Sequence, residues 1–206
     1  MILTARQSDA LTELLNIAFA STADALSKLT GHRVVLDSPN VVVVPLEQLV
    51  PTLARYVPGD VASVHQDFAG PIAGDAVLIL SHAGALALTG LLTDVAPAEE
   101  LDESAREVLT EVGNILLNAC LSMFGNLLKV RVAFSVPRLR LDTVEELIST
   151  FPSVAAENRH AIVVAMAFKV KGSSVAGYVA LVLGVASLTE LVAKVEAWEA
   201  RVGTPC

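Results

Sequence analysis

The same order of predicted elements runs twice along the chain. Apolar residues recur at helical spacing over residues 5–29 and again over residues 103–128. Short runs rich in β-branched residues follow each of these helices, and another helical pattern closes each half, at about residues 83–92 and 186–201. This doubled order predicts an internal duplication.

The two repeats would cover about residues 1–95 and 100–206 of a single domain, residues 1–206. Hydrophobic residues make up 53% of the chain and charged residues 17%, which argues against disorder and permits a sizeable core. Neither half looks self-sufficient. We therefore expect an α/β (α+β) fold with pseudo-twofold symmetry, in which both halves build one mixed or antiparallel sheet that long helices cover.

Local signals mark the ends of the two long helices. Thr4 and Gln7 form a candidate capping box, and Gly31 follows the end of the first helix. Asp102 is a candidate N-cap of the second helix, and Ser104 opens a competing capping box. The predicted strands are the runs HRVVLD, NVVVVP, VASVHQDF and DAVLIL in the first half and KVRVAF, PRLRL, AIVVAMAFKV and VAGYVALVL in the second.

The charge balance and the cysteines exclude several classes of protein. The net charge is −8 and no Lys- or Arg-rich run occurs, so we expect no nucleic-acid partner. The four histidines are scattered without ligand spacing, and no metal site is predicted. Cys120 is expected to be a small buried hydrophobe, and together with Cys206 it makes no disulfide framework. With polar residues soon after Met1, we expect a cytoplasmic protein.

The mean hydropathy of +0.61 raises the question of a membrane span. Residues 76–93 and 172–189 carry no formal charge if His82 is neutral, and 18 residues are long enough to cross a bilayer. Ser81, His82 and Gly84 interrupt the first of these stretches after a short apolar run. This pattern favours a buried strand that turns into a helix, and we expect no membrane span.

Polar residues gather on one side of each long helix, opposite the apolar stripe, when residues are placed 100° apart. These polar residues are Asp9, Glu13 and Asn16 on the first helix and Glu107, Glu111, Asn114 and Asn118 on the second. The stripes, which include Leu11 and Leu109, are expected to face the core. Polar residues are expected on the solvent-exposed side of any amphipathic helix, so their presence alone does not indicate a function. Only their spacing adds information.

That spacing forms the pattern E-x-x-N-x22-P in both halves. It consists of Glu13, Asn16 and Pro39, and again of Glu111, Asn114 and Pro137. Chance expects about 0.02 such patterns in a chain of this composition, and the chain has two. A duplication makes the second one less independent, but its retention needs a reason.

The pattern resembles that of the CheC/CheX/FliY phosphatases of bacterial and archaeal chemotaxis, in which an Asp or Ser precedes the Glu by four residues. Asp9 fits this position, and Glu107 takes it in the second half. The length and the duplication look most like CheC, and the resemblance covers essentially the whole chain. It implies a pseudo-twofold domain with two active sites, which hydrolyses the aspartyl phosphate of the response regulator CheY.

The resemblance also implies how the residues divide the work. Asn16 and Asn114 would orient the attacking water, because a neutral amide can donate and accept without repelling a phosphoryl group. Glu13 and Glu111 would pair with a Lys of the receiver. The Mg²⁺ is expected on the phosphorylated receiver, and the protein itself would need no cofactor. The two prolines would fix the loop and strand behind each helix.

An alternative is a binding module that docks a receiver, the deamidase CheD or the flagellar switch without turnover. A further expectation separates the two sites. Gly113 precedes Asn114 and is expected to leave room beside it, whereas Leu15 and Phe19 are expected to add bulk around Asn16. On this packing argument the second site should contribute more activity.

Overall fold

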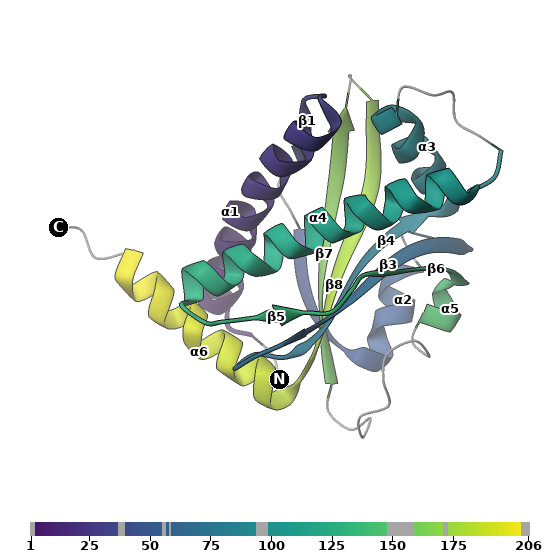
Figure 1. Cartoon of the computed structure of the whole chain (residues 1–206). Helices are drawn as coiled ribbons and strands as arrows, with labels where there is room; N and C mark the ends of the chain where they lie inside the picture. Colours follow the sequence, from purple (N-terminus) through teal and green to yellow (C-terminus); the bar gives the residue numbers. More distant parts are fainter. Residues whose placement is uncertain are drawn as a thin grey trace.

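The computed structural model describes residues 3–36, 40–54, 57, 59–93, 99–147, 159–170 and 173–202. The first half contains α1 (Ala5–Thr30), β1 (Val34–Leu36), β2 (Asn40–Pro45), η1 (Leu46–Gln48), α2 (Leu49–Leu53), β3 (Asp60–Ala69), β4 (Gly74–Ser81) and α3 (His82–Thr93). The second half contains α4 (Glu103–Leu128), β5 (Ala133–Phe134), β6 (Arg138–Thr143), α5 (Val144–Leu147), β7 (Arg159–Val170), β8 (Ser173–Gly184) and α6 (Val185–Val202). Figure 1 shows these elements along the chain.

Both halves contribute to one eight-stranded sheet, in the order β1-β7-β8-β4-β3-β5, with β2 also on β7 and β6 also on β3. Every strand pair in the described part of the chain is antiparallel. Within the described ranges, the short strands β1 and β2 pair only with a strand of the second half, and β5 and β6 only with a strand of the first. Each half completes the sheet of the other.

The long helices and the strands β2 and β6 keep the same offset in the sequence. The helices α1 and α4 are both 26 residues long. Asn40 and Arg138, the first residues of β2 and β6, are separated by the same 98 positions as Glu13 and Glu111. This is the order that a duplication would produce, and we retain the duplication as a proposal.

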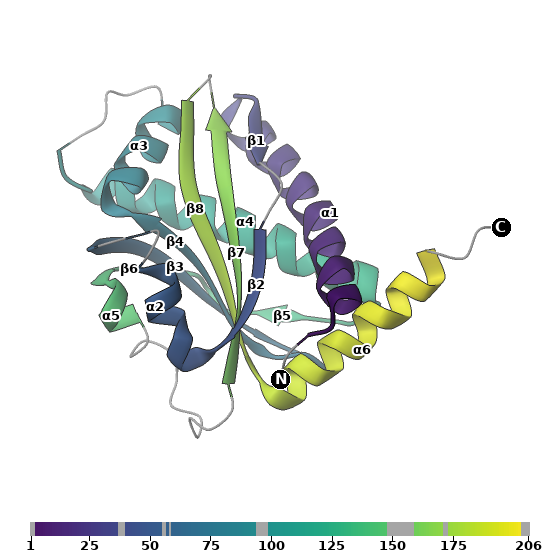
Figure 2. The ribbon, with the colours of Figure 1, turned by 180° about the vertical axis from the view of Figure 1, so that it is seen from behind.

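Two apolar cores lie on opposite faces of the sheet. The long helices α1 and α4 pack against each other over one face, with α3 and α6 beside them (Figure 1). The alternation of side chains along β3 sends Ala62 and Val64 into this core. Val61 points the other way, into a smaller core beneath α2 and α5, which are seen from behind in Figure 2. The sheet therefore has no apolar face left open around β3.

The predicted helices and their ends are confirmed. The capping box of Thr4 and Gln7 is present, and Gly31 ends α1 with a φ of 68°. Of the two predicted starts of α4, Asp102 is the one present, since its side chain accepts a hydrogen bond from the backbone N–H of Ala105.

Both stretches that raised the membrane question are a strand followed by a helix, namely β4 with α3 and β8 with α6. In the described ranges, one helix, α4, has the length and apolar composition of a membrane-crossing helix. Half of its most apolar window is buried inside the protein. Its apolar side packs on α1 and the sheet, as expected for a core helix.

The prediction for KVRVAF was too long, because only Ala133 and Phe134 pair as β5. Lys129 takes a left-handed conformation with a φ of 58°, and the N–H of Val130 donates to the carbonyl of Gly125. These residues close the end of α4 instead of starting a strand.

Candidate functional site

The polar side of α4 lies at the surface, as the helical period predicts. Glu107 and Glu111 are exposed, and Asn114 and Asn118 are half-buried. The opposite side is mostly buried and includes Leu109, which is 0% exposed. The helix therefore presents two carboxylates to solvent and then, over the next two turns, two amides at the edge of the core.

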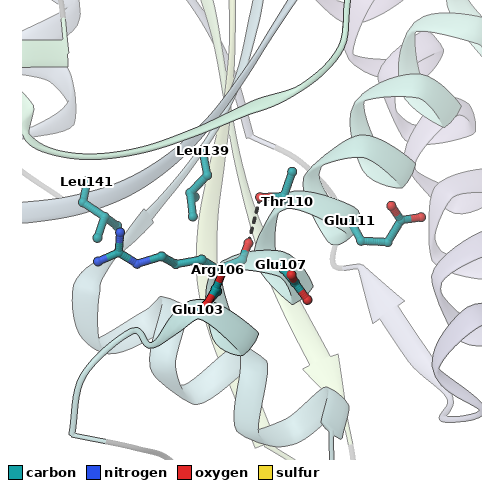
Figure 3. A pocket seen from close by; sticks show the side chains of 7 residues that line it. All are labelled: Glu103, Arg106, Glu107, Thr110, Glu111, Leu139 and Leu141. Atoms are coloured by element: carbon teal, nitrogen blue, oxygen red, sulfur yellow. Dashed lines mark hydrogen bonds between the residues drawn. The ribbon is translucent and has the colours of Figure 1, made fainter.

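Figure 3 shows a groove beside this helix, with a volume of about 660 Å³. Its lining residues are Glu103, Arg106, Glu107, Thr110 and Glu111 of α4 and Leu139 and Leu141 of β6. The Arg106 side chain donates to the carbonyl of Leu101, and the hydroxyl of Thr110 donates to the carbonyl of Arg106. Three carboxylates beside two leucines form an acidic groove that has an apolar part. We call it the α4–β6 groove.

Asn114 lies at the end of a chain of hydrogen-bonded amides. The Nδ2 of Asn118 donates to the Oδ1 of Asn114 at 2.6 Å. The Nε2 of Gln66, on β3, donates to the Oδ1 of Asn118 at 3.0 Å and to the backbone carbonyl of Ser135 at 3.0 Å. Gln66 is buried, so the chain runs from the core to the surface. Gln66 was predicted only as part of the strand VASVHQDF, and its contact with Asn118 was not predicted.

The connection between β5 and β6 is fixed beside these amides. Ser135 and Asp67 exchange two hydrogen bonds, from the N–H of Ser135 to the carbonyl of Asp67 and from the N–H of Asp67 to the Oγ of Ser135. Arg138 forms an ion pair with Asp67 at 3.1 Å. Pro137 is half-buried and directly precedes β6. Pro39, its predicted counterpart, lies outside the described residues.

The polar side of α1 is arranged differently. Asp9 and Glu13 are exposed and Asn16 is half-buried, as at the second site. However, an exposed Ala20 occupies the place that Asn118 has on α4. Within the described residues, no side-chain hydrogen bond of Asn16 is present. Among these residues, nothing ties its amide to the sheet.

Strand register identifies the counterpart of Gln66. Arg138 of β6 pairs with His65, and Asn40 of β2 pairs with Ala165. Under the proposed duplication, Asn40 and Arg138 are equivalent positions, so the residues after their partners, Gln66 and Met166, correspond to each other as well. Met166 is buried and cannot donate a hydrogen bond. The first half thus has methionine and alanine where the second has glutamine and asparagine.

The structure corrects the expectation about crowding around Asn16. Leu15 and Phe19 are 0% and 2% exposed, so they lie in the core and add no bulk to the exposed side of α1. Gly113 is buried too, and a Cβ on it would stand 2.5 Å from Cγ1 of Val64. Its role is to let α4 approach β3. The two sites differ in the hydrogen bonding of the amide, not in the bulk beside it.

Cys120 and His65, which lie outside this chain of amides, have shifted pKa values. Burial raises the pKa of the Cys120 thiol to about 12, which leaves it protonated and unreactive, and its place in the core was predicted. Burial and then Arg140 lower the pKa of His65 to about 4. In the part of the chain that the structure describes, no group of three His, Cys, Asp or Glu residues could hold a metal ion.

No protein-family model matches the sequence. FliY from Thermotoga maritima matches with a TM-score of 0.76 and 22% identity, over 98% of this chain and 99% of that one. The FliM middle domain from H. pylori matches with a TM-score of 0.64 and 13% identity, over 93% and 99%. A CheX–CheY–BeF3–Mg²⁺ complex from Borrelia burgdorferi matches with a TM-score of 0.50 and 14% identity, over 81% and 96%.

These similarities are at low identity and concern the fold. The closer likeness to CheC stays a prediction. The structural neighbours nevertheless match the CheC/CheX/FliY family to which the repeated Glu and Asn motif pointed, and the chain has the fold of that family.

Proposed function

We propose that the protein accelerates hydrolysis of the aspartyl phosphate of a CheY-type receiver, mainly through the site on α4. The observation that carries this proposal is Asn114, which is half-buried, held at 2.6 Å by Asn118 and one turn from the exposed Glu111. An amide held in this way suits a reaction that needs a water molecule in a fixed position more than it suits simple adhesion.

The reaction replaces the bond between phosphorus and the receiver's carboxylate by a bond to water, and it releases the carboxylate and inorganic phosphate. The receiver supplies Mg²⁺. The Oδ1 of Asn114 accepts from Asn118 and keeps a second lone pair for the attacking water. The negative charge of Glu111 would repel the phosphoryl group, so its carboxylate pairs with a Lys of the receiver instead.

The α4–β6 groove would then receive the surface of the receiver beside its phosphorylation site. The carboxylates of Glu103, Glu107 and Glu111 favour a positively charged partner, and Leu139 and Leu141 offer it an apolar contact. The CheX of the Borrelia burgdorferi complex is bound to CheY in the presence of BeF3 and Mg²⁺, which supports a receiver as the partner.

A binding module without turnover is the second candidate. It is favoured by the FliM middle domains among the structural neighbours, which include a FliG–FliM complex and a FliM–SpeE complex from H. pylori. On this reading the protein would hold a receiver, CheD or a component of the flagellar switch. The first half fits this role better than the second, because the amide of Asn16 has no hydrogen bond to a described residue.

Turnover separates the two candidates. A CheY-type receiver is phosphorylated with a small-molecule phosphodonor, the donor is removed, and release of inorganic phosphate is followed with the protein at one-tenth of the receiver concentration. The phosphatase proposal expects each protein molecule to clear many receivers. Binding to the beryllofluoride form of the receiver, with no acceleration of phosphate release, would instead establish the binding module.

A further inference from the structure

Gln66 is the one buried polar side chain on the face of β3 that packs under α1 and α4, within the described length of the strand. Ala62, Val64 and Phe68 share its face of the strand and belong to the core beneath α1 and α4. Gln66 is 1% exposed, and both hydrogens of its Nε2 are used, on Asn118 and on the backbone of Ser135. Its Oε1 is buried and accepts no hydrogen bond from the described residues.

An unpaired buried acceptor weakens a fold, and an apolar side chain of similar size would avoid it. The equivalent position in the first half shows that solution, because Met166 occupies it. Packing therefore does not account for a glutamine at position 66, and what it has that methionine lacks is the pair of hydrogen bonds that its Nε2 donates.

The hydrogen bonds fix the direction of each amide in turn. The backbone carbonyl of Ser135 can only accept, so the side of Gln66 that faces it must be the NH2 group. The same NH2 group faces Asn118, which must therefore present its Oδ1 to Gln66 and its Nδ2 to Asn114. Asn114 must then turn its Oδ1 inward, toward Asn118. The NH2 group of Asn114 is left free to donate outward.

We infer that Gln66 is a positioning residue, which sets the rotamer and the direction of the Asn114 amide through Asn118. This inference rests on the proposed phosphatase function. With the direction fixed, the NH2 group of Asn114 meets an oxygen of the phosphoryl group, and the second lone pair of its Oδ1 accepts from the attacking water. Gln66 touches neither substrate nor water, so its effect passes through the two asparagines.

The test compares Gln66→Met, which copies the first half, with the parent protein and with Met166→Leu as the matched control. Turnover of phosphorylated receiver is measured over a range of receiver concentrations. For Gln66→Met we expect kcat to fall about tenfold, because the rate depends steeply on the placement of the amide, while KM stays within about twofold. The melting temperature should stay close to that of the parent, and Met166→Leu should keep the parent's kcat.

A double-mutant cycle tests the route of the effect. If Gln66 acts through Asn118, then Gln66→Met combined with Asn118→Ala should lower kcat no further than the more severe single variant. Losses that multiply would contradict the relay. So would a Gln66→Met variant that is folded and keeps the parent's kcat, or one whose whole loss lies in KM.

A readout without turnover distinguishes this inference from the proposed function. The side-chain NH2 of Asn118 is identified in ¹⁵N NMR spectra by its absence from Asn118→Ala. In Gln66→Met we expect this signal to shift and its hydrogens to exchange faster with water. An active parent with an unchanged Asn118 signal in Gln66→Met would overturn the relay alone. A parent that never releases phosphate would overturn the phosphatase function, whatever the NMR signal shows.

Discussion

Gly113 of α4 and Val64 of β3 are in such close contact that a Cβ on Gly113 would stand 2.5 Å from Cγ1 and 2.6 Å from Cβ of Val64. Val64 is buried and β-branched, so it has little freedom to move aside. Because residue 113 has no side chain, the helix that carries Glu111 and Asn114 can pack closely against the strand that carries Gln66.

Gly113→Ala should destabilise the protein by about 1–3 kcal/mol, although alanine is the better helix former, because the added methyl group overpacks the interface. Urea denaturation gives the free energy of unfolding. Combined with Val64→Ala, the substitution should cost less than the sum of the two single changes, since the second removes the clash. Costs that simply add would show that this contact is not what the glycine serves.

Leu109→Asp should cost several kcal/mol or prevent folding, because Leu109 is 0% exposed and the core offers no partner for a carboxylate. The matched control is Ser122→Asp, at an exposed position of the same helix, where we expect a change of about 0.5 kcal/mol or less. Thermal unfolding followed by circular dichroism compares the two. A Leu109→Asp variant as stable as the control would mean that the face of α4 assigned to the core is wrong.

The stability of the protein should fall in mild acid because of His65. Burial and then Arg140 lower its pKa from 6.5 to about 4 in the folded state, so between these values the unfolded chain takes up a proton that the folded one does not. The free energy of unfolding should therefore fall as the pH drops below 6.5, by roughly 2–3 kcal/mol at pH 4.5 from this group.

His65→Gln isolates this contribution, since glutamine does not titrate and can still bond to Ser63, the partner of His65 at 2.9 Å. Urea denaturation at pH 7 and pH 4.5 should show a smaller drop for the variant than for the parent. Other groups titrate in both proteins and cancel in the difference. Equal drops would indicate that His65 is protonated as easily in the folded state as in the unfolded one.

The helices could be predicted from the sequence because their signals are local. The 3.6-residue period placed Leu11 and Leu109 in the core, and Thr4 and Asp102 marked the starts of α1 and α4. The strand β5 was predicted four residues too long, because Lys129 could equally belong to a strand or to the end of a helix. That choice depends on its left-handed conformation, which the sequence pattern does not reveal.

The amide chain could not be predicted, because it depends on long-range register. Nothing within β3 indicates that Gln66 faces Asn118, which lies 52 positions away in the sequence. The pairing of β2 with β7 and of β6 with β3 could not be predicted either, because alternating apolar residues identify a strand but not its partner. A single signal was present, since glutamine is an unusual residue on the apolar face of a buried strand.

The two sites should contribute unequally to turnover. Asn114→Ala should lower the rate of phosphate release roughly tenfold, because the amide that it removes is the one held in a fixed position. Asn16→Ala should have a smaller effect, because no described hydrogen bond fixes Asn16. The single variants are compared at equal saturation with receiver. A larger loss from Asn16→Ala would contradict the assignment of the main site to α4.

The most direct measurement is phosphate release from a phosphorylated CheY-type receiver by the parent protein and by the double variant Asn16→Ala, Asn114→Ala. Both side chains are half-buried at the surface, so the double variant should fold, and circular dichroism and binding to the beryllofluoride receiver verify this. We expect the parent to accelerate dephosphorylation over many turnovers, and the folded double variant to leave the receiver at its own hydrolysis rate. A folded double variant that releases phosphate as fast as the parent would contradict the proposed function.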